Sequence, residues 1–399
     1  MGLGAEQGLR QPLAIIFGFG FIALFASVGA LGIAAAVFIA SVLALPSFSR
    51  LKTLLPLELP FAIFLIFIAW AWASSSWSPY PKSDQAWKMA LGLPVYCLFA
   101  YSVWSLRGKA RLWALYAAFS GLMVLFFVYT LEAITGVISG LFAEGNAREQ
   151  MLRDATRGVS ALVCVTPVAW AFVAMLVPGW RGIAAGILLA LLAGFVSWKL
   201  GLSAGVVAIG FGAILFGIGW LFPRTTILVV GLIAVGMLML APMGIPLVLG
   251  LLDTNELPAT WDVRVQIWQI ASERIAQKPL FGWGLDASRA FTDLYVARGV
   301  DVQFRAAHPH NIGLQIWLET GLVGVLLFSA AALALAVRVA NSWNLTRSQG
   351  AAIAASAGVI LIFGMVTYGA WQEWFWACTA WVAAMCFLVG PEPEKRAEL

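Results

Sequence analysis

The chain has 399 residues and a formal net charge of +5; 62% of its residues are hydrophobic and 11% are charged. Soluble globular domains contain about 25% charged residues, so this composition excludes that class and indicates a polytopic membrane protein. A modest excess of basic residues is usual in the cytoplasmic loops of such proteins. We therefore expect membrane lipid around the chain and predict no nucleic-acid partner.

Apolar stretches divide the chain into predicted membrane spans, because about 20 helical residues cross the hydrocarbon core. The predicted fold class is all-α, with about twelve spans. They are expected at residues 12–29, 31–46, 57–77, 87–105, 111–141, 157–177, 181–198, 201–222, 225–251, 310–339, 349–369 and 371–389. The predicted organisation is nine spans in residues 1–251, a loop at 252–309, three spans in 310–390 and a tail at 391–399.

Basic residues in the short loops predict how the chain is oriented. About twice as many of them fall on the side that carries the N-terminus as on the opposite side, and the cytoplasmic side is the one enriched in Lys and Arg. Both termini are therefore expected in the cytoplasm and residues 252–309 outside it. The apolar run after Arg10 resembles a signal anchor more than a cleaved signal.

The long loop is predicted to be folded around an amphipathic helix. Trp261, Arg264 and Trp268 share one face of this helix, which is expected to end before Pro279. The aromatic and isoleucine content of residues 252–309 argues against a disordered connector.

A turn and a second helix are predicted to follow within the loop. The glycines of residues 281–284 favour a turn. Asp is a preferred residue just before a helix and Gly just after one, so a helix is expected from Asp286 to about Arg298, closed by Gly299. The loop is thus predicted to hold two helices.

Both histidines of the chain, His308 and His310, lie at the start of the tenth span. Proline favours the first turn of a helix, so Pro309 predicts a helix that begins there and places His310 in its first turn. The positive end of the helix dipole disfavours imidazolium and would keep His310 neutral, able to accept a proton. The alternative is a solvent-facing histidine that only ends the loop.

Three basic residues on the side of the long loop could bind an anionic substrate. Arg264 could present its planar guanidinium to a phosphate or could pair with a loop aspartate. Lys199 ends the seventh span, where it either extends to the membrane surface or faces a polar cavity. Arg157 opens the sixth span and is either an interfacial flank or part of a site.

One acidic side chain lies inside the tenth span. Glu319 needs a partner or a cavity there, and Gln315, one turn earlier, shares its face. We expect Glu319 to be hydrogen-bonded and structural rather than catalytic. The chain has neither a Walker A motif nor a His/Cys/Asp cluster with the spacing of metal ligands, so no nucleotide-driven pump, metal site or cofactor is predicted.

Four short motifs occur in order between residues 261 and 324. They are Arg264 with Trp268, Pro279 to Gly284, His308 to Asn311, and Gly321 with Gly324. With the predicted topology they resemble the signature of the O-antigen ligase superfamily, whose members are bacterial inner-membrane proteins of about twelve spans with one large periplasmic loop. The remaining spans match that family only in number and hydrophobicity.

The resemblance implies a transferase of lipopolysaccharide biosynthesis. Such an enzyme moves O-antigen from an undecaprenyl-diphosphate donor to a sugar hydroxyl of lipid A–core on the periplasmic side. By position, His310 matches the family's essential histidine and Arg264 its loop arginine, with His308 and Asn311 as supporting neighbours. A second family arginine stands at the outer end of a span, and the nearest residue here is Lys199, which keeps the charge and loses the bidentate geometry.

The implied chemistry suits these residue types. Arg264, Lys199 and Arg157 could stabilise the charge that grows on a leaving diphosphate, and a neutral His310 could remove the proton of the attacking hydroxyl. Direct attack on an α-linked donor would invert the anomeric centre. No carboxylate cluster suggests a divalent metal, so the reaction is expected to be metal-independent.

Alternatives stay open. An O-antigen polymerase of the same superfamily uses the same donor with a different acceptor, and the short tail favours the ligase. Protein-glycosylating oligosaccharyltransferases tend to carry more sequence after the last span. A transporter of lipid-linked glycan would need ionisable residues along a path through the spans, whereas the polar cluster predicted here lies at one mouth.

Overall fold

The computed structural model describes residues 9–45, 57–141, 146–251, 259–297, 300–303, 308–342 and 344–392. This part of the chain is almost wholly helical, and its strands form one short hairpin. The predicted all-α class of a polytopic membrane protein is therefore confirmed.

Twelve of the described helices correspond one to one with the predicted spans. They are α1 (Arg10–Ser27), α2 (Ile33–Leu43), α4 (Leu59–Ser74), α5 (Gln85–Trp104), α6 (Gly108–Thr135), α8 (Asn146–Leu176), α9 (Trp180–Lys199), α10 (Ser203–Leu221), α11 (Pro223–Gly250), α13 (Ile312–Ala340), α14 (Arg347–Val366) and α15 (Glu373–Leu388). Ten helices of the described chain are long and apolar enough to cross a membrane, and α2 and α15 are shorter apolar helices. The correspondence arises because backbone polar groups in hydrocarbon must pair within their own segment.

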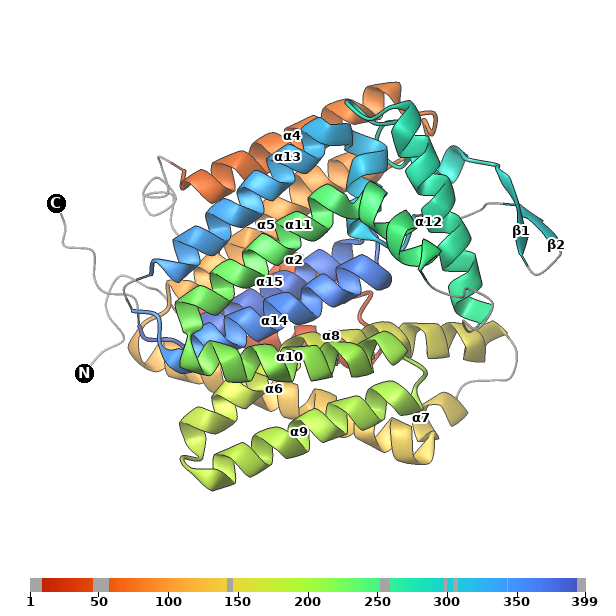
Figure 1. Ribbon diagram of the computed structural model, residues 1–399. Coiled ribbons are helices and arrows are strands. Elements are labelled where there is room, and N and C mark those ends of the chain that lie inside the picture. Colours follow the sequence, from red (N-terminus) through yellow and green to blue (C-terminus); the bar gives the residue numbers. More distant parts are fainter. Residues whose placement is uncertain are drawn as a thin grey trace.

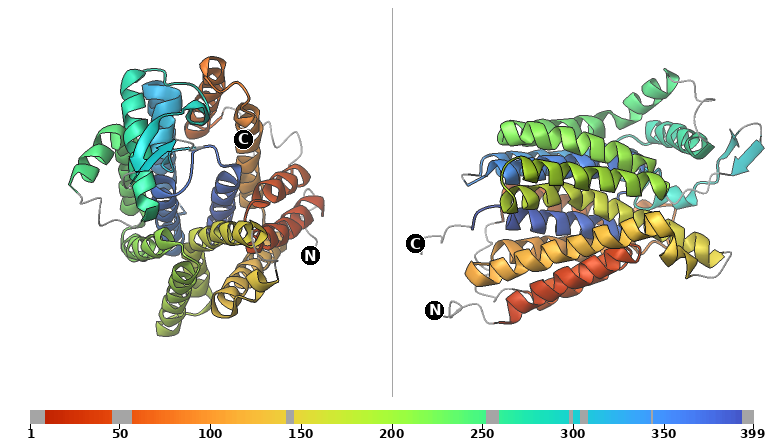
Figure 2. Two further views of the ribbon diagram at one scale, coloured as in Figure 1. Left: turned by 90° about the vertical axis from the view of Figure 1, so that its right-hand side faces the viewer. Right: turned by 90° about the horizontal axis from the view of Figure 1, so that it is seen from below.

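The helices lie side by side in one bundle, and α12 (Ala259–Gln277) projects from one end of it (Figure 1). We call this the loop end. The opposite end, the terminal end, holds both the start of α1 and the residues after α15, as Figure 2 shows in its right view. There the Arg10 guanidinium donates to the carbonyl of Leu43 at 3.1 Å, and the amide of Gly108 donates to Glu392 at 2.9 Å. The loop and the two described termini are thus on opposite ends, as predicted, while the identity of each membrane side stays a prediction.

The loop itself differs from the prediction after α12. The helix α12 ends before Pro279 as expected, but the second helix predicted from Asp286 is wrong. A single 3-10 turn, η3 (Ala287–Ala290), is followed by strands β1 (Leu294–Ala297) and β2 (Val300–Gln303), which pair antiparallel. Asp286 has a left-handed backbone (φ 63°) and pairs with Arg289 instead of capping a helix, and β-branched valines favour the extended strands. The predicted closing residue Gly299 lies outside the described residues.

The helix α8 lies at the centre of the bundle, because 83% of the residues in its apolar stretch are buried. It packs against α14 and α9, and α14 in turn packs closely on α10. Small residues permit that approach: a Cβ atom on Gly212 would lie 2.8 Å from Val359, and one on Gly219 would lie 3.0 Å from the Cα of Ala351. This packing fixes α14, whose last residue leads directly into the site described below.

The sequence predicted one continuous span at residues 310–339. The structure instead shows α13 broken at Gly321. Gly321 has φ 65° and ψ −168°, a conformation that only glycine adopts readily. The chain just after α12 fills the break: the amide of Leu322 donates to Pro279 at 2.8 Å, and the amide of Gly284 donates to Glu319 at 2.9 Å. A Cβ on Gly321 would lie 2.3 Å from the carbonyl oxygen of Leu280.

The break explains two of the sequence motifs in physical terms. A Cβ on Gly282 would lie 2.6 Å from the backbone of Glu319, so Gly282 and Gly321 are both needed where two backbones meet. The small 3-10 element η1 (Ser75–Trp77) follows α4 on the outer side of this contact, and Trp70 in α4 donates its indole N–H to the carbonyl of Thr320 at 3.0 Å. The remaining short helix, α7 (Val137–Gly140), lies after α6, away from the break.

Candidate functional site

The helix α13 begins at Ile312, three residues after Pro309, where the sequence predicted its start. Asn311 is its N-cap, with φ −151°, and its Oδ1 accepts the amide N–H of Leu314 at 2.9 Å. Asparagine is among the best N-cap residues, so this signal was present in the sequence. The amide group of Asn311 also donates to the carbonyl of Met365 at 2.8 Å. Both histidines therefore lie just outside the helix, and Asn311 joins them to the end of α14.

His310 lies in a left-handed backbone conformation, with φ 56°. Its Nδ1 is 2.9 Å from the carbonyl oxygen of Thr367. A carbonyl can only accept, so Nδ1 carries the proton and a neutral ring keeps the Nε2 lone pair available. Burial, and secondarily the charge of Arg264, lowers the pKa of His310. The predicted neutral histidine is thus supported by burial and not by the helix dipole.

His308 is held from both sides of its ring. Its Nδ1 accepts the backbone N–H of His310 at 3.1 Å, and its Nε2 lies 2.9 Å from the side-chain amide of Gln372. The two imidazole rings are 4.3 Å apart between centroids. Burial, and then the neighbouring His310 and arginines, lowers the pKa of His308 to about 3. His308 is therefore neutral at physiological pH.

Residues 365–372 comprise the last two residues of α14 and the chain that leads to α15, and we call them the α14–α15 connection. They contact most of the candidate residues. In chain order, they contact Asn311 (through the carbonyl of Met365), Arg264 (Val366), His310 (Thr367), Ser160 (Tyr368), Gln315 (Ala370), Glu319 (Trp371) and His308 (Gln372). The predicted spans at 349–369 and 371–389 left one residue between them, so no separate segment was predicted here. The polar Thr367, Tyr368 and Gln372 around Gly369, within an otherwise apolar run, are the signal that could have identified it.

Arg264 reaches the site from α12. Its guanidinium donates to the carbonyl of Val366 at 2.7 Å, directly beside the Thr367 carbonyl that binds His310. One turn on, the indole of Trp268 donates to the carbonyl of Pro309 at 2.8 Å. Burial lowers the pKa of Arg264, and the nearby Tyr368 opposes that shift. Seen from the loop end, α12 covers the α11 and α13 side of the bundle (Figure 2, left view). The predicted pair of a histidine and the loop arginine is thus brought together.

Arg157 and Lys199 differ in their placement. Arg157 in α8 pairs with Asp154, and one turn on, the Ser160 hydroxyl lies 2.6 Å from that of Tyr368. Arg157 thus lies on the side of α8 that faces the connection at 365–372, and its charge acts to lower the pKa of Tyr368, which burial raises. Lys199 is exposed at the end of α9, 5.9 Å from the ring of Trp198. Among the contacts described, none links Lys199 to the histidines, and the main packing partners of α9 are α6, α8 and α10.

Glu319 is fully buried and hydrogen-bonded, as expected. Its carboxylate accepts from the backbone of Asp286, from the indole of Trp371, from Gln315 at 3.1 Å and from Ser288 at 3.3 Å. These donors come from the loop, from α13 itself and from the α14–α15 connection. A buried carboxylate is tolerated when its acceptor sites are filled in this way, so Glu319 ties the loop to the bundle.

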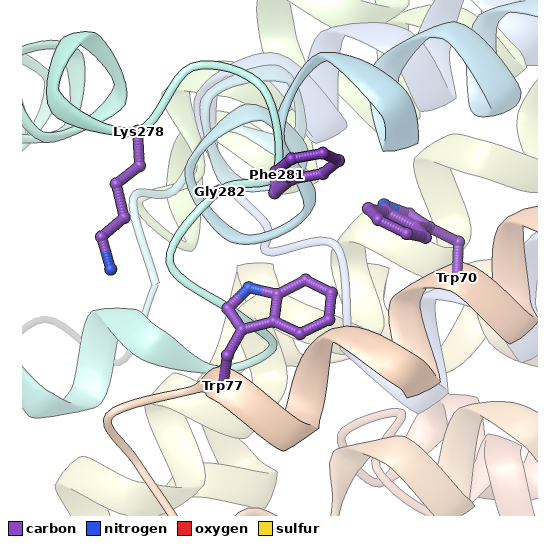
Figure 3. Close-up of a pocket in the computed structure, with 5 residues that line it drawn as sticks. All are labelled: Trp70, Trp77, Lys278, Phe281 and Gly282. Atoms are coloured by element: carbon purple, nitrogen blue, oxygen red, sulfur yellow. The ribbon is translucent and has the colours of Figure 1, made fainter.

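An aromatic cleft of about 450 Å³ lies on the other side of the α13 break (Figure 3). Trp70, Trp77 and Phe281 lie around it, and Gly282 and Lys278 also line it. The Lys278 ammonium lies 4.0 Å above the ring of Trp283. This cleft is apolar with one cation at its edge, and neither histidine is among the residues that line it.

The described residues contain no group of three or more His, Cys, Asp or Glu side chains that could hold a metal ion. The chemistry open to the site is that of a neutral imidazole with adjacent guanidinium groups: removal of a proton beside a group that carries negative charge. Metal independence of any reaction stays a prediction.

Comparison with known proteins is consistent with the motifs. Residues 189–329 match a family model described as "O-Antigen ligase", and the resemblance seen in the sequence is thereby confirmed. A "Putative polysaccharide ligase" of Rickettsia bellii is 32% identical over 135 residues, and proteins of similar name from Rickettsia conorii and Rickettsia felis are 30% and 31% identical over 135 and 136 residues. Each match covers 32% of this chain and 32% of the relative, so the chain matches about a third of the length of these curated relatives. The family match includes Arg264 and His310 and ends before the connection at 365–372.

Proposed function

Because residues 189–329 match the O-antigen ligase family, we propose that this membrane protein is an O-antigen ligase. It transfers polysaccharide from an undecaprenyl-diphosphate carrier to a sugar hydroxyl of lipid A–core. The observation that carries the proposal is the placement of a neutral His310, with Nδ1 bound to Thr367, beside the guanidinium of Arg264 on the adjacent carbonyl.

The proposed reaction is a direct displacement at the anomeric carbon. The acceptor hydroxyl loses its proton to Nε2 of His310 as its oxygen attacks, and the bond from the anomeric carbon to the diphosphate breaks with both electrons leaving on the phosphate oxygen. Undecaprenyl diphosphate departs, and an α-linked donor gives an inverted product. No metal is required in this scheme, because positive side chains meet the charge of the leaving group.

Two arginines are the first candidates for that charge. Arg264 donates to Val366, and the five N–H donors of a guanidinium form a planar fork that matches the oxygens of a phosphate group. Arg157 approaches the same connection from α8 through the turn that ends at Ser160. Lys199 stays a third candidate by its match to the family motif, and its exposed position on α9 makes it the one least supported by the geometry.

The aromatic cleft is proposed to receive sugar residues of the acceptor that do not react. The apolar faces of sugar rings pack well on indole and phenyl rings, and the cleft offers three such rings with one ammonium group. Gly282 of the cleft approaches the backbone of Glu319, which is eight residues after Asn311, or about 12 Å along the helix axis. Contacts at that distance would supply binding energy remote from the reacting group.

The site is proposed to face the periplasm in the bacterial inner membrane. The basic residues of the short loops support that orientation, and the site lies wholly at the loop end. Labelling by an impermeant thiol reagent in cells with a permeabilised outer membrane tests it: a cysteine at exposed Ala276 in α12 should react, and one at exposed Lys109 at the terminal end should not. The reverse pattern would refute the orientation.

In vitro transfer with purified protein tests the division of labour. His310→Ala should lose about two to four decades of turnover, the usual share of a general base, with donor binding nearly unchanged. Arg264→Ala should weaken both donor binding and turnover. Arg274→Ala is the matched control, because Arg274 is on the same helix and pairs with Asp293 instead of reaching the site. Near-normal turnover by His310→Ala would rule out its role as the base.

A deletion strain separates the ligase from its alternatives. Loss of a ligase leaves full-length polymer on the lipid carrier and none on lipid A–core. Loss of an O-antigen polymerase, the second candidate, leaves single repeat units attached to lipid A–core. A transporter of lipid-linked glycan would give no transfer in the purified system at all.

A further inference from the structure

His310 adopts a backbone conformation that it would not hold unaided. Its φ of 56° is in the left-handed region, which only three non-glycine residues occupy in the described chain. A non-glycine residue in this region is strained, and it keeps that conformation only when the surrounding structure holds it. The direction of its imidazole depends on this conformation, so whatever holds the backbone of His310 also aims its Nε2.

The ring of His308 supplies a direct hold. Its Nδ1 accepts the backbone N–H of His310 at 3.1 Å. This acceptor is two residues back along the chain, across Pro309, so the bond closes a tight loop around the proline. The N–H that it occupies belongs to the same residue whose φ is left-handed, and the bond therefore restrains that torsion directly.

The far side of the His308 ring fixes which nitrogen carries the proton. An imidazole whose Nδ1 accepts must, when neutral, carry its proton on Nε2. That Nε2 lies 2.9 Å from the side-chain amide nitrogen of Gln372, whose amide oxygen is buried without a hydrogen-bond partner. Because a protonated Nε2 needs an acceptor, the Gln372 amide must turn its oxygen toward the ring, an exchange of two atoms of nearly equal size, and Gln372 then selects the tautomer. Charged neighbours act in the same direction: Arg289 and Arg264 both disfavour a protonated His308, and burial does so most strongly.

Gly369 packs directly against the ring of His308. A Cβ atom there would lie 2.7 Å from Cγ of His308 and 2.8 Å from Oε1 of Gln315. Only glycine leaves room for the imidazole against the α14–α15 connection. The ring is thus confined by Gly369 on one face and hydrogen-bonded at both nitrogens, which is more restraint than a histidine needs for packing alone.

We propose that His308 is a positioning residue for His310: a hydrogen-bond acceptor, set in its tautomer by Gln372, that holds the backbone of His310 so that Nδ1 binds Thr367 and Nε2 faces the acceptor hydroxyl. For its effect on turnover the proposal rests on the function proposed above. The two histidines are then unequal, because His310 exchanges a proton in the reaction and His308 does not.

Three substitutions of His308 separate the two ends of its ring. The amide oxygen of Asn can stand where Nδ1 accepts, whereas Gln reaches toward Gln372 and leaves the His310 amide without an acceptor; Ala removes both. Turnover should fall about ten- to a hundredfold in His308→Ala and His308→Gln, and His308→Asn should recover much of the loss. The KM of either substrate should change little. Gly369→Ala, which displaces the ring, should resemble His308→Ala.

A readout independent of activity uses the fact that the chain has only two histidines. In protein labelled with ¹⁵N-histidine, the ring signals should show His308 protonated at Nε2 and His310 protonated at Nδ1. In His308→Ala and His308→Gln the remaining signal should become a mixture of tautomers, and in His308→Asn it should return to Nδ1–H. This experiment decides the positioning role even if no transfer activity is found.

Two results would overturn the proposal. One is a single Nδ1–H tautomer of His310 with wild-type turnover in His308→Ala, which would make the contact incidental. The other is an activity–pH profile that loses one of its limbs in His308→Asn, which would mean that His308 itself exchanges a proton.

Discussion

Asn311 offers a sharp test of how the site is held, because its side chain makes two separable contacts. Its Oδ1 caps α13 by accepting the Leu314 N–H at 2.9 Å, and its Nδ2 donates to the Met365 carbonyl at 2.8 Å. Both bonds are buried. The first belongs to the start of a helix, while the second joins segments 54 residues apart and keeps His310 beside Thr367.

The two contacts predict a graded series of substitutions. Loss of an N-cap side chain costs about 1 kcal/mol, and a buried carbonyl left without a donor costs about 1–3 kcal/mol. Asn311→Ala loses both, or about 2–4 kcal/mol, whereas Asn311→Ser keeps a cap acceptor and loses only the bond to Met365. Since about 1.4 kcal/mol is a tenfold change, local opening at the start of α13 should become about 30- to 1000-fold more frequent in Asn311→Ala.

Hydrogen–deuterium exchange of the amides in residues 312–318 measures that opening directly. Exchange should be fastest in Asn311→Ala, intermediate in Asn311→Ser and unchanged in Asn341→Ala, a matched control at the exposed far end of the same helix. Turnover should fall in the same order, because His310 loses its alignment with Thr367. Exchange in Asn311→Ala equal to that of the control would refute the view that this side chain holds the site together.

Three further outcomes are expected. Turnover should fall as the pH drops through the lowered pKa of His310. Arg264→Gln should move this acid limb of the pH profile to higher pH, because removing a neighbouring positive charge makes the His310 ring easier to protonate. An unmoved limb would show that Arg264 does not act on the base. Activity should persist in excess EDTA, and a loss reversed by magnesium or manganese would contradict the metal-independent scheme. Trp77→Ala should raise the KM for the acceptor and leave the KM for the donor unchanged. The control Trp72→Ala removes an exposed tryptophan near the end of α4, just before η1 and outside the cleft, and should alter neither. Equal effects would identify Trp77 as a membrane anchor only.

Much of the helical architecture could be read from the sequence, for a physical reason. A run of about 20 apolar residues in lipid has no alternative to a helix, because its backbone groups find no other partners. The helix α12 could also be predicted, for a different reason. The spacing of Arg264 and Trp268 on one face indicated an amphipathic helix that ends before a proline. The candidate base and the loop arginine were also visible, through motifs that are local in the chain.

The start of α13 and the hairpin show where local patterns mislead. Pro309 and Asn311 each favour a helix start, and the choice of Asn311 depends on Met365, which it binds from 54 residues away. Asp286 looked like an N-cap, yet its carboxylate pairs with Arg289 and its amide is taken by Glu319. In both cases a distant partner decided between two local options of similar energy.

By itself the sequence determined the twelve apolar helices, the helical start of the loop and the candidate histidine, since each depends on residues within about two helical turns of one another. Only the tertiary structure decided that residues 365–372 join His308, His310, Arg264 and Glu319, that Lys199 stands apart from them, and that α13 breaks at Gly321 where the loop backbone enters. These features depend on contacts between segments separated by tens to hundreds of residues, and whether such segments meet depends on the packing of the whole bundle.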